Sequence, residues 1–273
     1  MAHVVVPEAE AVLDQEFPVL DRGFVRLVDY LGSDERIVAS ARVSYGKGTK
    51  TVREDRGLIQ YLLRNAHTSP FEQVVLTFHC KMPVFVARQW IRHRTARLNE
   101  ISGRYSVMKD EFYLPTADAV RTQSAINKQG RSEQPVTPEV AARVLSELEA
   151  GQKRAYLEYQ GMLADGVARE LARIHLPLGL YTEWYWQIDL HNLFHFLKLR
   201  LDEHAQWEIR EYAKVLADLA RRVAPLAWEA FEDCVLKSAV LTEEELLWVK
   251  EHLRDAEGMP PQLPGKLGLP PQE

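Results

Sequence analysis

Several features that mark exported, membrane or disulfide-rich proteins are scarce or missing in this sequence. Only two cysteines, Cys80 and Cys234, occur among 273 residues, and they lie far apart. This excludes a disulfide framework and a CxxC metal or redox motif. No apolar run approaches the roughly 18 residues of a membrane-spanning helix, and no basic segment precedes the short apolar run at the N-terminus. We therefore expect an unexported protein in a reducing, cytoplasmic setting, with no membrane partner.

An excess of positive charge is also missing. The chain has 34 Lys and Arg residues against 39 Asp and Glu residues, which gives a formal net charge of -5. Within this acidic background, five arginines gather between residues 88 and 104 with only Glu100 among them: Arg88, Arg92, Arg94, Arg97 and Arg104. A local cationic patch on an acidic protein indicates a small anionic ligand, and it argues against nucleic acid as a partner.

The apolar pattern predicts a mixed α/β protein. Alternating apolar residues predict strands, and apolar residues at helical spacing predict helices. The predicted strands cover residues 23–32, 74–81 and 180–188, with an edge strand over 108–115. The predicted helices cover 34–43, capped by Ser33 or Asp34, and 55–66, 83–94, 137–164, 167–175, 189–204, 205–223 and 242–254. The hydrophobic content of 46% can build a substantial core.

The main body of the chain shows no internal repeat and no linker, so we expect a single domain over residues 19–240. Residues 1–18 have no periodicity and form either a leader strand or a loose arm. Residues 116–138 are rich in polar residues and predict a long excursion of the kind that serves as a lid or stays disordered. Residues 241–273 are expected to form a helix followed by a proline-rich tail.

The densest functional signal is the stretch from Met82 to Ser106. Pro83 suits the first turn of a helix, and the spacing places Arg88 and Arg92 on a cationic face, with Arg94 toward the apolar side. A buried charge needs a partner. The small polar residues of S102-G-R-Y-S106 could continue a cradle for phosphate. The alternative interpretation is a solvated basic face.

Three further places carry candidate residues whose interpretation stays open. The helix over 55–66 stops before Pro70, so His67 and Ser69 lie in a turn, where a histidine is either functional or an ordinary surface residue. Arg173 ends a predicted helix, where a cation either stabilises the helix dipole or binds a ligand. His191 and His195 share a helical face, with His204 beyond them.

The three histidines raise the alternative of a zinc-dependent hydrolase built on His191, His195 and His204. An HxxxH spacing on a helix can hold zinc. The stretch lacks the Glu of an HExxH motif and has no thiolate nearby. We therefore favour neutral histidines beside a bound ring or phosphate, and we expect no metal.

A set of motifs gives the sequence a family resemblance. R92-H-R94, seven residues and then Ser102 form an RHRx7S signature, which continues as SGRYS and follows FVARQW at 85–90. HTSPFE at 67–72, RIHLPLGLYTEWYW at 173–186 and DLHNLFHFLKLRLDEHAQWE at 189–208 accompany it in the same order as in the family. Over residues 23–231 the chain resembles the flavin-dependent thymidylate synthases.

This resemblance implies a reaction, a fold and an assembly. The expected reaction is reductive methylation of dUMP to dTMP, with methylenetetrahydrofolate as carbon donor and with FAD, reduced by NADPH, as hydride carrier. The expected fold is a single mixed α/β domain with a central, mostly antiparallel sheet flanked by long helices. The expected assembly is a homotetramer whose active sites are shared between subunits.

The resemblance also implies residue roles. Arg200 is the catalytic residue, placed against the pyrimidine to favour its ionised form. The implied dUMP contacts are Gln89, Arg92, Glu100, Ile101, Ser102, Gly103, Arg104, Arg173 and Arg200. The implied FAD contacts are Ser69, Arg92, His93, Arg94, Glu100, Asp189, Leu190, His191 and His195. His67 and Tyr105 would lie near the flavin and folate rings.

The cysteines agree with this type of synthase, because it needs no activated thiolate. Cys80 alternates within a predicted strand and Cys234 lies among apolar residues, so both are expected to be small buried residues. Ser102 has no adjacent base in the sequence, and we expect it to position a ligand rather than to act as a nucleophile.

Overall fold

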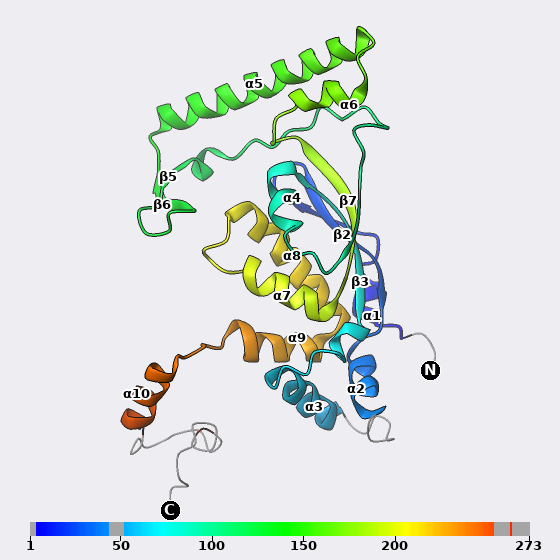
Figure 1. Ribbon diagram of the computed structural model, residues 1–273, viewed down its shortest axis with the longest axis vertical. Helices are drawn as coiled ribbons and strands as arrows, with labels where there is room; N and C mark the ends of the chain where they lie inside the picture. Colours follow the sequence, from blue (N-terminus) through cyan, green and yellow to red (C-terminus); the bar gives the residue numbers. More distant parts are fainter. Residues whose placement is uncertain (1–3, 44–51, 254–262, 264–273) are drawn as a thin grey trace, which may run out of the picture.

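The structure, a computed structural model, describes residues 4–43, 52–253 and residue 263 (Figure 1). Its centre is a sheet with the strand order β1-β2-β3-β7-β4, in which every neighbouring pair is antiparallel. The strands are β1 (Glu16–Val19), β2 (Gly23–Leu31), β3 (Val75–Pro83), β4 (Arg97–Glu100) and β7 (Tyr181–Asp189). The predicted mixed α/β fold with an antiparallel sheet is confirmed, and β2, β3 and β7 match three of the predicted strands.

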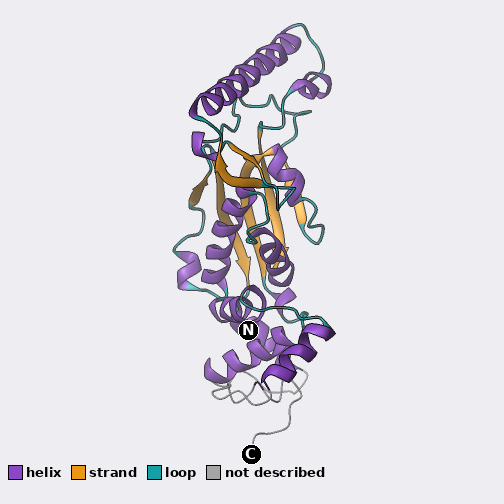
Figure 2. Ribbon diagram, turned by 90° about the vertical axis from the view of Figure 1, so that its left-hand side faces the viewer, coloured by secondary structure: helices purple, strands orange, loops and turns teal. Residues whose placement is uncertain are grey.

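One face of the sheet is apolar and is covered by helices. Along β7, the buried residues Trp184, Trp186 and Ile188 alternate with more exposed ones, because successive side chains of a strand point to opposite faces. The covering helices are α4 (Val84–Trp90), α7 (Leu190–Arg200) and α8 (Trp207–Val223) (Figures 1 and 2). Trp90 is fully buried, with its ring centroid 5.2 Å from that of Trp186 and 5.1 Å from that of Phe196. This packing fixes the end of α4 against both the sheet and α7.

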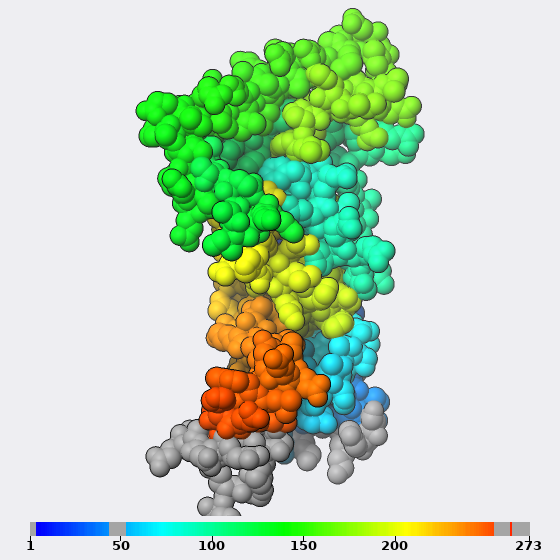
Figure 3. Space-filling view, turned by 60° about the vertical axis from the view of Figure 1, so that its left-hand side comes forward, coloured from blue at the N-terminus to red at the C-terminus, as the bar shows by residue number. Residues whose placement is uncertain are grey.

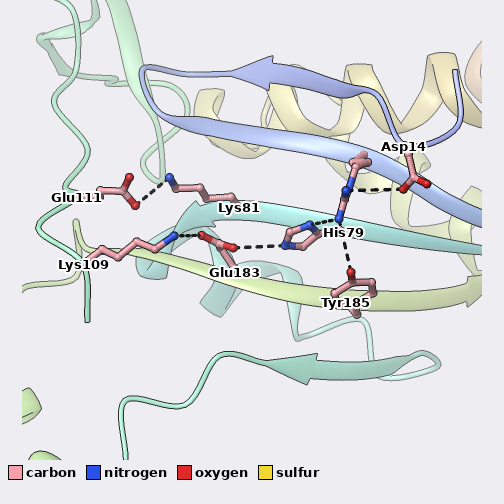
Figure 4. Close-up of polar contacts among 8 residues, drawn as sticks. Asp14, His79, Lys81, Lys109, Glu111, Glu183 and Tyr185 are labelled. Atoms are coloured by element: carbon pink, nitrogen blue, oxygen red, sulfur yellow. Dashed lines mark hydrogen bonds and ion pairs between the residues drawn. The ribbon is translucent and has the colours of Figure 1, made fainter. Parts of the chain in front are cut away.

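The opposite face carries polar side chains that contact one another across the strands (Figure 4). Arg26 of β2 contacts His79 of β3 at 2.9 Å, and His79 lies 3.4 Å from Glu183 of β7. Lys109 reaches the other oxygen of Glu183 at 3.2 Å, and Lys81 pairs with Glu111 at 2.8 Å. On this face, cross-strand polar pairs replace the helix packing of the apolar face.

The helices α2 (Asp34–Arg42), α3 (Val52–Arg64) and α9 (Pro225–Phe231) lie at one end of the sheet (Figure 1). The π-helical turn η5 (Glu232–Leu236) comes directly after α9. Ser33 is the residue before α2, but its side chain makes no cap hydrogen bond. Asp34 is buried and caps a different helix, because its carboxylate accepts hydrogen bonds from Leu226 N at 2.7 Å and Ala227 N at 2.9 Å. The predicted helix over 34–43 is confirmed, whereas a cap by either side chain on that helix is wrong.

The other end of the molecule carries α5 (Pro138–Ala164), with α6 (Arg169–Ala172) and the 3₁₀ turn η4 (Arg173–His175) beside it (Figure 1). Thr137 caps α5 by accepting from Val140 N at 3.4 Å, so the predicted helix 137–164 is confirmed at both ends. The polar segment before it contains η3 (Ala117–Ala119) and the hairpin β5 (Arg121–Gln123) and β6 (Arg131–Pro135). This segment is therefore structured rather than irregular.

The predicted edge strand over 108–115 is wrong. Its only β contact among the described residues is an isolated bridge between Phe112 and Leu180. Two tyrosines of α5 take the place of a strand partner: the Tyr159 hydroxyl accepts from Met108 N at 3.1 Å, and the Tyr156 hydroxyl donates to Met108 O at 3.0 Å. The segment is held as a loop against α5, with Met108, Phe112 and Tyr113 buried.

The two ends of the chain differ in how far they join the core. Near the N-terminus, Val6, Ala9 of α1 (Pro7–Glu10), Val12 and Val19 of β1 join the core. Of the two alternatives for residues 1–18, a strand is present over residues 16–19. Near the C-terminus, α10 (Glu243–Leu253) begins after Thr242, which exchanges hydrogen bonds with Glu245 as a capping box. Apart from residue 263, the proline-rich tail lies outside the described residues.

The structure also bears on the predicted burial of the two cysteines and on membrane-spanning helices. Cys80 is fully buried, as predicted, whereas Cys234 is only half-buried. Across the described parts of the chain, no helix combines the length and the apolar character that crossing a membrane requires.

Candidate active site

The segment that follows β3 ends its helix earlier than the sequence predicts. Pro83 has extended backbone angles and precedes the helix, and α4 stops at Trp90 instead of residue 94. The buried ring of Trp90 anchors the last turn, after which His93 N donates to Trp90 O at 3.0 Å and the chain leaves the helix. Arg94 is therefore exposed, and the prediction that it faces the apolar side and needs a buried partner is wrong.

A cluster forms where this turn meets α7, and we call His93, His195, Phe196 and Arg200 the histidine–arginine cluster. The Nε–H of Arg200 donates to Nε2 of His93 at 3.1 Å. The His93 ring lies 5.7 Å from His195 and 4.8 Å from Phe196, measured between centroids. Asp189 begins α7 by accepting from Asn192 N at 2.9 Å, which places all three partners of His93 on one capped helix.

The electrostatics of the cluster follow from its burial. Burial, together with the nearby charge of Arg200 and the neighbouring His195, lowers the pKa of His93 to about 4. His93 is therefore neutral at physiological pH, and because its Nε2 accepts from Arg200, the ring proton is on Nδ1. Burial also lowers the pKa of Arg200, although a guanidinium stays charged in proteins. The cluster thus presents a half-buried cation held in a fixed orientation by an uncharged ring.

A second region is the turn Ser102–Ser106, which we call the serine–glycine turn. It follows β4, where Ile101 N donates to Glu183 O at 2.9 Å and the Thr182 hydroxyl donates to Glu100 at 2.5 Å. Arg104 N then donates to the Ser102 hydroxyl at 3.2 Å, and Tyr105 N donates to Ser102 O at 3.1 Å. Local backbone hydrogen bonds therefore hold this turn.

Residues from α6 and η4 lie against the serine–glycine turn. A Cβ at Gly103 would lie 3.1 Å from Cδ of Arg173, so the missing side chain makes room for that arginine. Arg169 donates to Tyr105 O at 3.3 Å, and Glu170 pairs with Arg104 at 3.3 Å. The structure thus brings Arg173, which is distant in sequence, to Ser102, Gly103 and Arg104, as the predicted grouping expects.

Arg173 itself begins a 3₁₀ turn and does not end a helix, because α6 is only four residues long. The predicted helix over 167–175 is therefore wrong in length, and a stabilising role of Arg173 at the dipole of a long helix does not apply. Within the described ranges, the side chains of Arg88, Arg92, Arg94 and Arg173 make no hydrogen bond or ion pair with the protein. These guanidinium groups are free to bind an anionic ligand.

The other predicted flavin contacts lie in different surroundings. Ser69 is exposed and lines a cavity of about 430 Å³ beside α2, together with Arg36, Ser40 and Gln73. His67 is exposed, with its ring 5.9 Å from that of Tyr61. The side chain of Leu190 is fully buried in the core. Only His93 and His195 of the predicted flavin contacts join the histidine–arginine cluster.

The zinc alternative receives no support. In the ranges that the structure describes, no three His, Cys, Asp or Glu side chains come together as a metal site. His195 faces His93, and His204 instead contacts Asp202, with Nδ1 2.8 Å from the carboxylate. The helical spacing of the histidines is real, but the side chains of His195 and His204 have other partners.

The sequence did not predict a role for Gln206 and Glu208, two residues that lie beside the site. Gln89 donates from its amide to Gln206, and Gln206 donates to Glu208 at 2.8 Å. Gln206 and Glu208 belong to the motif HAQWE, which is part of the family resemblance. A Glu at the start of an otherwise amphipathic helix was the available signal, but it also fits an ordinary helix N-terminus.

Comparisons with known proteins agree with this geometry. Residues 26–226 match the model of the family described as thymidylate synthase complementing protein. The chain is 61% identical over 234 residues to the flavin-dependent thymidylate synthase of Treponema denticola, and the match covers 86% of this chain and 88% of that protein. The chain belongs to the flavin-dependent thymidylate synthases. This confirms the predicted enzyme class, and with it FAD as the cofactor.

Two further similarities support the assignment. A flavin-dependent thymidylate synthase of Thermus thermophilus is 59% identical over 229 residues, which is 84% of this chain and 83% of that protein. The crystal structure of a UMP/dUMP methylase, PolB from Streptomyces cacaoi, bound with 5-Br dUMP is 31% identical and has a TM-score of 0.73. It covers 80% of this chain and 98% of that chain. This flavin-dependent synthase thus shares its fold with a methylase of uridine nucleotides.

Proposed function

We propose that this enzyme methylates dUMP to dTMP, with methylenetetrahydrofolate as carbon donor and NADPH as the reductant of FAD. The observation that carries the proposal is the hydrogen bond from Arg200 to the neutral His93, because it fixes the orientation of a half-buried cation. Arg92 and Arg94, the sequence neighbours of His93, have no polar partner among the described residues. The Streptomyces cacaoi methylase, with a bound dUMP analogue, supports the choice of nucleotide.

Arg200 is proposed as the catalytic residue. Carbon 5 of the pyrimidine becomes a nucleophile only when negative charge on the ring is stabilised, and a positioned cation in a partly buried site does this effectively. An arginine cannot act as the base. His93 keeps the guanidinium in place without adding a competing charge, since its pKa is lowered to about 4.

The nucleotide would be held by the serine–glycine turn and by side chains around it. Arg92, Arg104 and Arg173 supply guanidinium groups that suit a phosphate, and Ser102 supplies a hydroxyl. Gln89, Glu100, Ile101, Gly103 and Arg200 complete the proposed dUMP contacts. The exposed position of the turn supports this role, because a ligand can reach it from solvent.

The residues fit FAD in their chemistry. When bound, FAD supplies the hydride for the transferred carbon. The imidazoles of His93, His191 and His195 offer ring faces. The guanidinium groups of Arg92 and Arg94, unpaired in the described part of the chain, suit the negative phosphates of a dinucleotide. Ser69, Glu100, Asp189 and the backbone of Leu190 complete the proposed contacts. His67 and Tyr105 are proposed to lie near the flavin and folate rings.

We also propose a cytoplasmic homotetramer whose active sites are shared between subunits. Large apolar side chains near the serine–glycine turn are exposed in the single chain, including Tyr105 at 79% and Ile174 at 75%. Such a patch is typical of a protein interface. The cluster and the turn would then be completed by residues of a neighbouring subunit.

The decisive experiment is dTMP formation from dUMP by the purified protein supplied with FAD, NADPH and methylenetetrahydrofolate, with each component omitted in turn. We expect product only when all four are present. Product formation that continues without the folate would overturn the proposed carbon donor. A flavin-like visible spectrum without any product would contradict the assigned substrate.

A further inference from the structure

A chain of hydrogen bonds links Gln89 of α4 to a buried carboxylate on α8. Gln89 donates from Nε2 to Oε1 of Gln206, and Gln206 donates from Nε2 to Oε2 of Glu208 at 2.8 Å. Glu208 is only 4% exposed. Its other oxygen accepts from the Tyr113 hydroxyl at 3.2 Å. The chain thus connects a proposed dUMP contact with an interior residue that cannot itself reach a ligand.

The donor and acceptor roles along this series of hydrogen bonds are set at its buried end, Glu208. Nη2 of Arg131 lies 2.8 Å from Oε2 of Glu208, a contact with the geometry of an ion pair, and Glu208 paired in this way can only accept hydrogen bonds. Burial and the nearby Glu208 raise the pKa of Tyr113, so its phenol stays a donor. Gln206 must therefore turn its NH₂ toward Glu208 and its carbonyl toward Gln89.

The orientation of the Gln89 amide follows from that of Gln206. Its NH₂ faces the carbonyl of Gln206, which leaves its own carbonyl oxygen for another partner. The two ends of an amide side chain are nearly equal in shape, so without such a network either end could face a ligand. A reversed Gln89 amide would set its carbonyl against the carbonyl of Gln206, acceptor to acceptor, which leaves both groups unsatisfied.

Arg131, the ion-pair partner of Glu208, belongs to the β5–β6 hairpin. Arg131 is the first residue of β6, and its guanidinium also lies over the Trp207 ring at 5.7 Å and donates to Ala119 O at 2.9 Å. Asn127 in the same hairpin donates to His204 O at 3.4 Å. In Figure 3 the green hairpin segment rests on the yellow segment between α7 and α8. The hairpin thus secures the loop that carries Gln206.

We propose that Glu208 is a positioning residue for the nucleotide. Acting through Gln206, it holds the Gln89 amide with its carbonyl oxygen toward the substrate, where that oxygen accepts a hydrogen bond from a donor of dUMP. This proposal rests on the proposed function, because it deepens the role of Gln89 in the same site. Glu208 itself makes no contact with the ligand.

A double-mutant cycle on the FAD-bound enzyme tests the proposal, with the dissociation constant of dUMP measured by titration calorimetry. We expect Glu208→Ala and Gln89→Ala each to weaken dUMP binding about tenfold, because each removes or misdirects one buried hydrogen bond. The double variant should bind no more weakly than Gln89→Ala alone, because Glu208 acts only through Gln89. A merely structural role would persist in the Gln89→Ala background, and additive losses would overturn the proposal.

Further variants keep the test decisive. Glu208→Gln can keep an oxygen toward Arg131 and Gln206, so we expect dUMP binding within about twofold of wild type. Gln206→Met interrupts the chain without removing the carboxylate, and it should reproduce the loss if Glu208→Ala does not fold. Glu211→Ala, on the same helix in an exposed pair with Lys214, is the control and should bind normally.

The outcomes separate this proposal from the proposed function. Normal dUMP binding by both Glu208→Ala and Gln206→Met would overturn the positioning role alone. A wild-type enzyme that binds FAD but not dUMP would overturn both.

Discussion

The histidine–arginine cluster and the serine–glycine turn carry most of the proposed site, and they are built in opposite ways. In the cluster, side chains hold side chains: Arg200 donates to His93, and His93 packs on Phe196. In the turn, backbone hydrogen bonds set the conformation, and Tyr105 is 79% exposed. Arg173 reaches the turn without any hydrogen bond or ion pair in the described part of the chain.

This difference indicates a division of labour. A half-buried cation with a fixed partner costs no reorganisation when charge develops on a substrate, so it suits stabilisation of a transition state. Exposed, unpaired guanidinium groups gain their partners only when a ligand arrives, so they suit binding. Changes in the cluster should therefore act mainly on kcat, and changes in the turn should act mainly on KM.

The strongest way to sharpen this comparison is to remove the cation of the cluster. We expect Arg200→Ala to lower kcat by about 10²–10³-fold, because it deletes a preorganised charge stabiliser. FAD binding should persist, which the flavin absorbance of the purified variant measures. Lys198→Ala on the exposed side of the same helix is the control, with near-normal kcat. Near-normal turnover of Arg200→Ala would remove this residue from the mechanism.

The matching change in the turn is Arg173→Ala. We expect KM for dUMP to rise about 10–100-fold, since a hydrogen bond between charged groups contributes roughly 1.5–3 kcal/mol. The value of kcat should change much less than in Arg200→Ala. Steady-state kinetics with dUMP as the varied substrate make the measurement, and Arg143→Ala in an exposed pair on α5 is the control. A loss confined to kcat would contradict the division of labour.

The sequence predicted the regular parts of the fold because their periodicity is local. The alternation in β7 and the spacing and cap of α5 are visible in the chain itself, and both elements appear where predicted. The early end of α4 was missed because the packing of Trp90 against β7 and α7 decides it. The false strand over 108–115 was missed because tyrosines 48 and 51 residues away bond its backbone.

The same distinction applies to the site. The RHRx7S signature led to His93 and to the turn, and the structure brings Arg200 and Arg173 to them. The chain of hydrogen bonds from Gln89 through Gln206 to Glu208 was not predicted. Gln89 and Gln206 are 117 residues apart, and only tertiary packing joins them. Hydrogen-bond partners of this kind leave no periodic trace in a sequence.

A smaller effect concerns the protonation of His93. Its folded-state pKa, about 4, is below the ordinary value of 6.5, so between these values the unfolded chain binds more protons than the folded one. Stability from this group is therefore full above pH 6.5 and is lost as the pH falls toward 4. We expect urea denaturation of wild type to show this decline, and His93→Phe to show a shallower one. Equal slopes for both proteins would contradict the neutral state of His93.

The mildest test adds one methyl group to the turn. In Gly103→Ala the new Cβ would lie 3.1 Å from Cδ of Arg173 and 3.1 Å from Sδ of Met108, closer than ordinary contact. Both neighbours belong to flexible side chains, so they can shift by a few tenths of an ångström at little cost in stability. We expect a melting temperature within about 2 °C of wild type and a rise of a few-fold in KM for dUMP, because Arg173 is displaced. Gly151→Ala, where no atom lies within 4 Å of the added Cβ, is the matched control. An unchanged KM in Gly103→Ala would mean that the close approach of Arg173 to Gly103 does not set the position of this arginine. The proposed contrast between the packed cluster and the serine–glycine turn would then lose its structural reason.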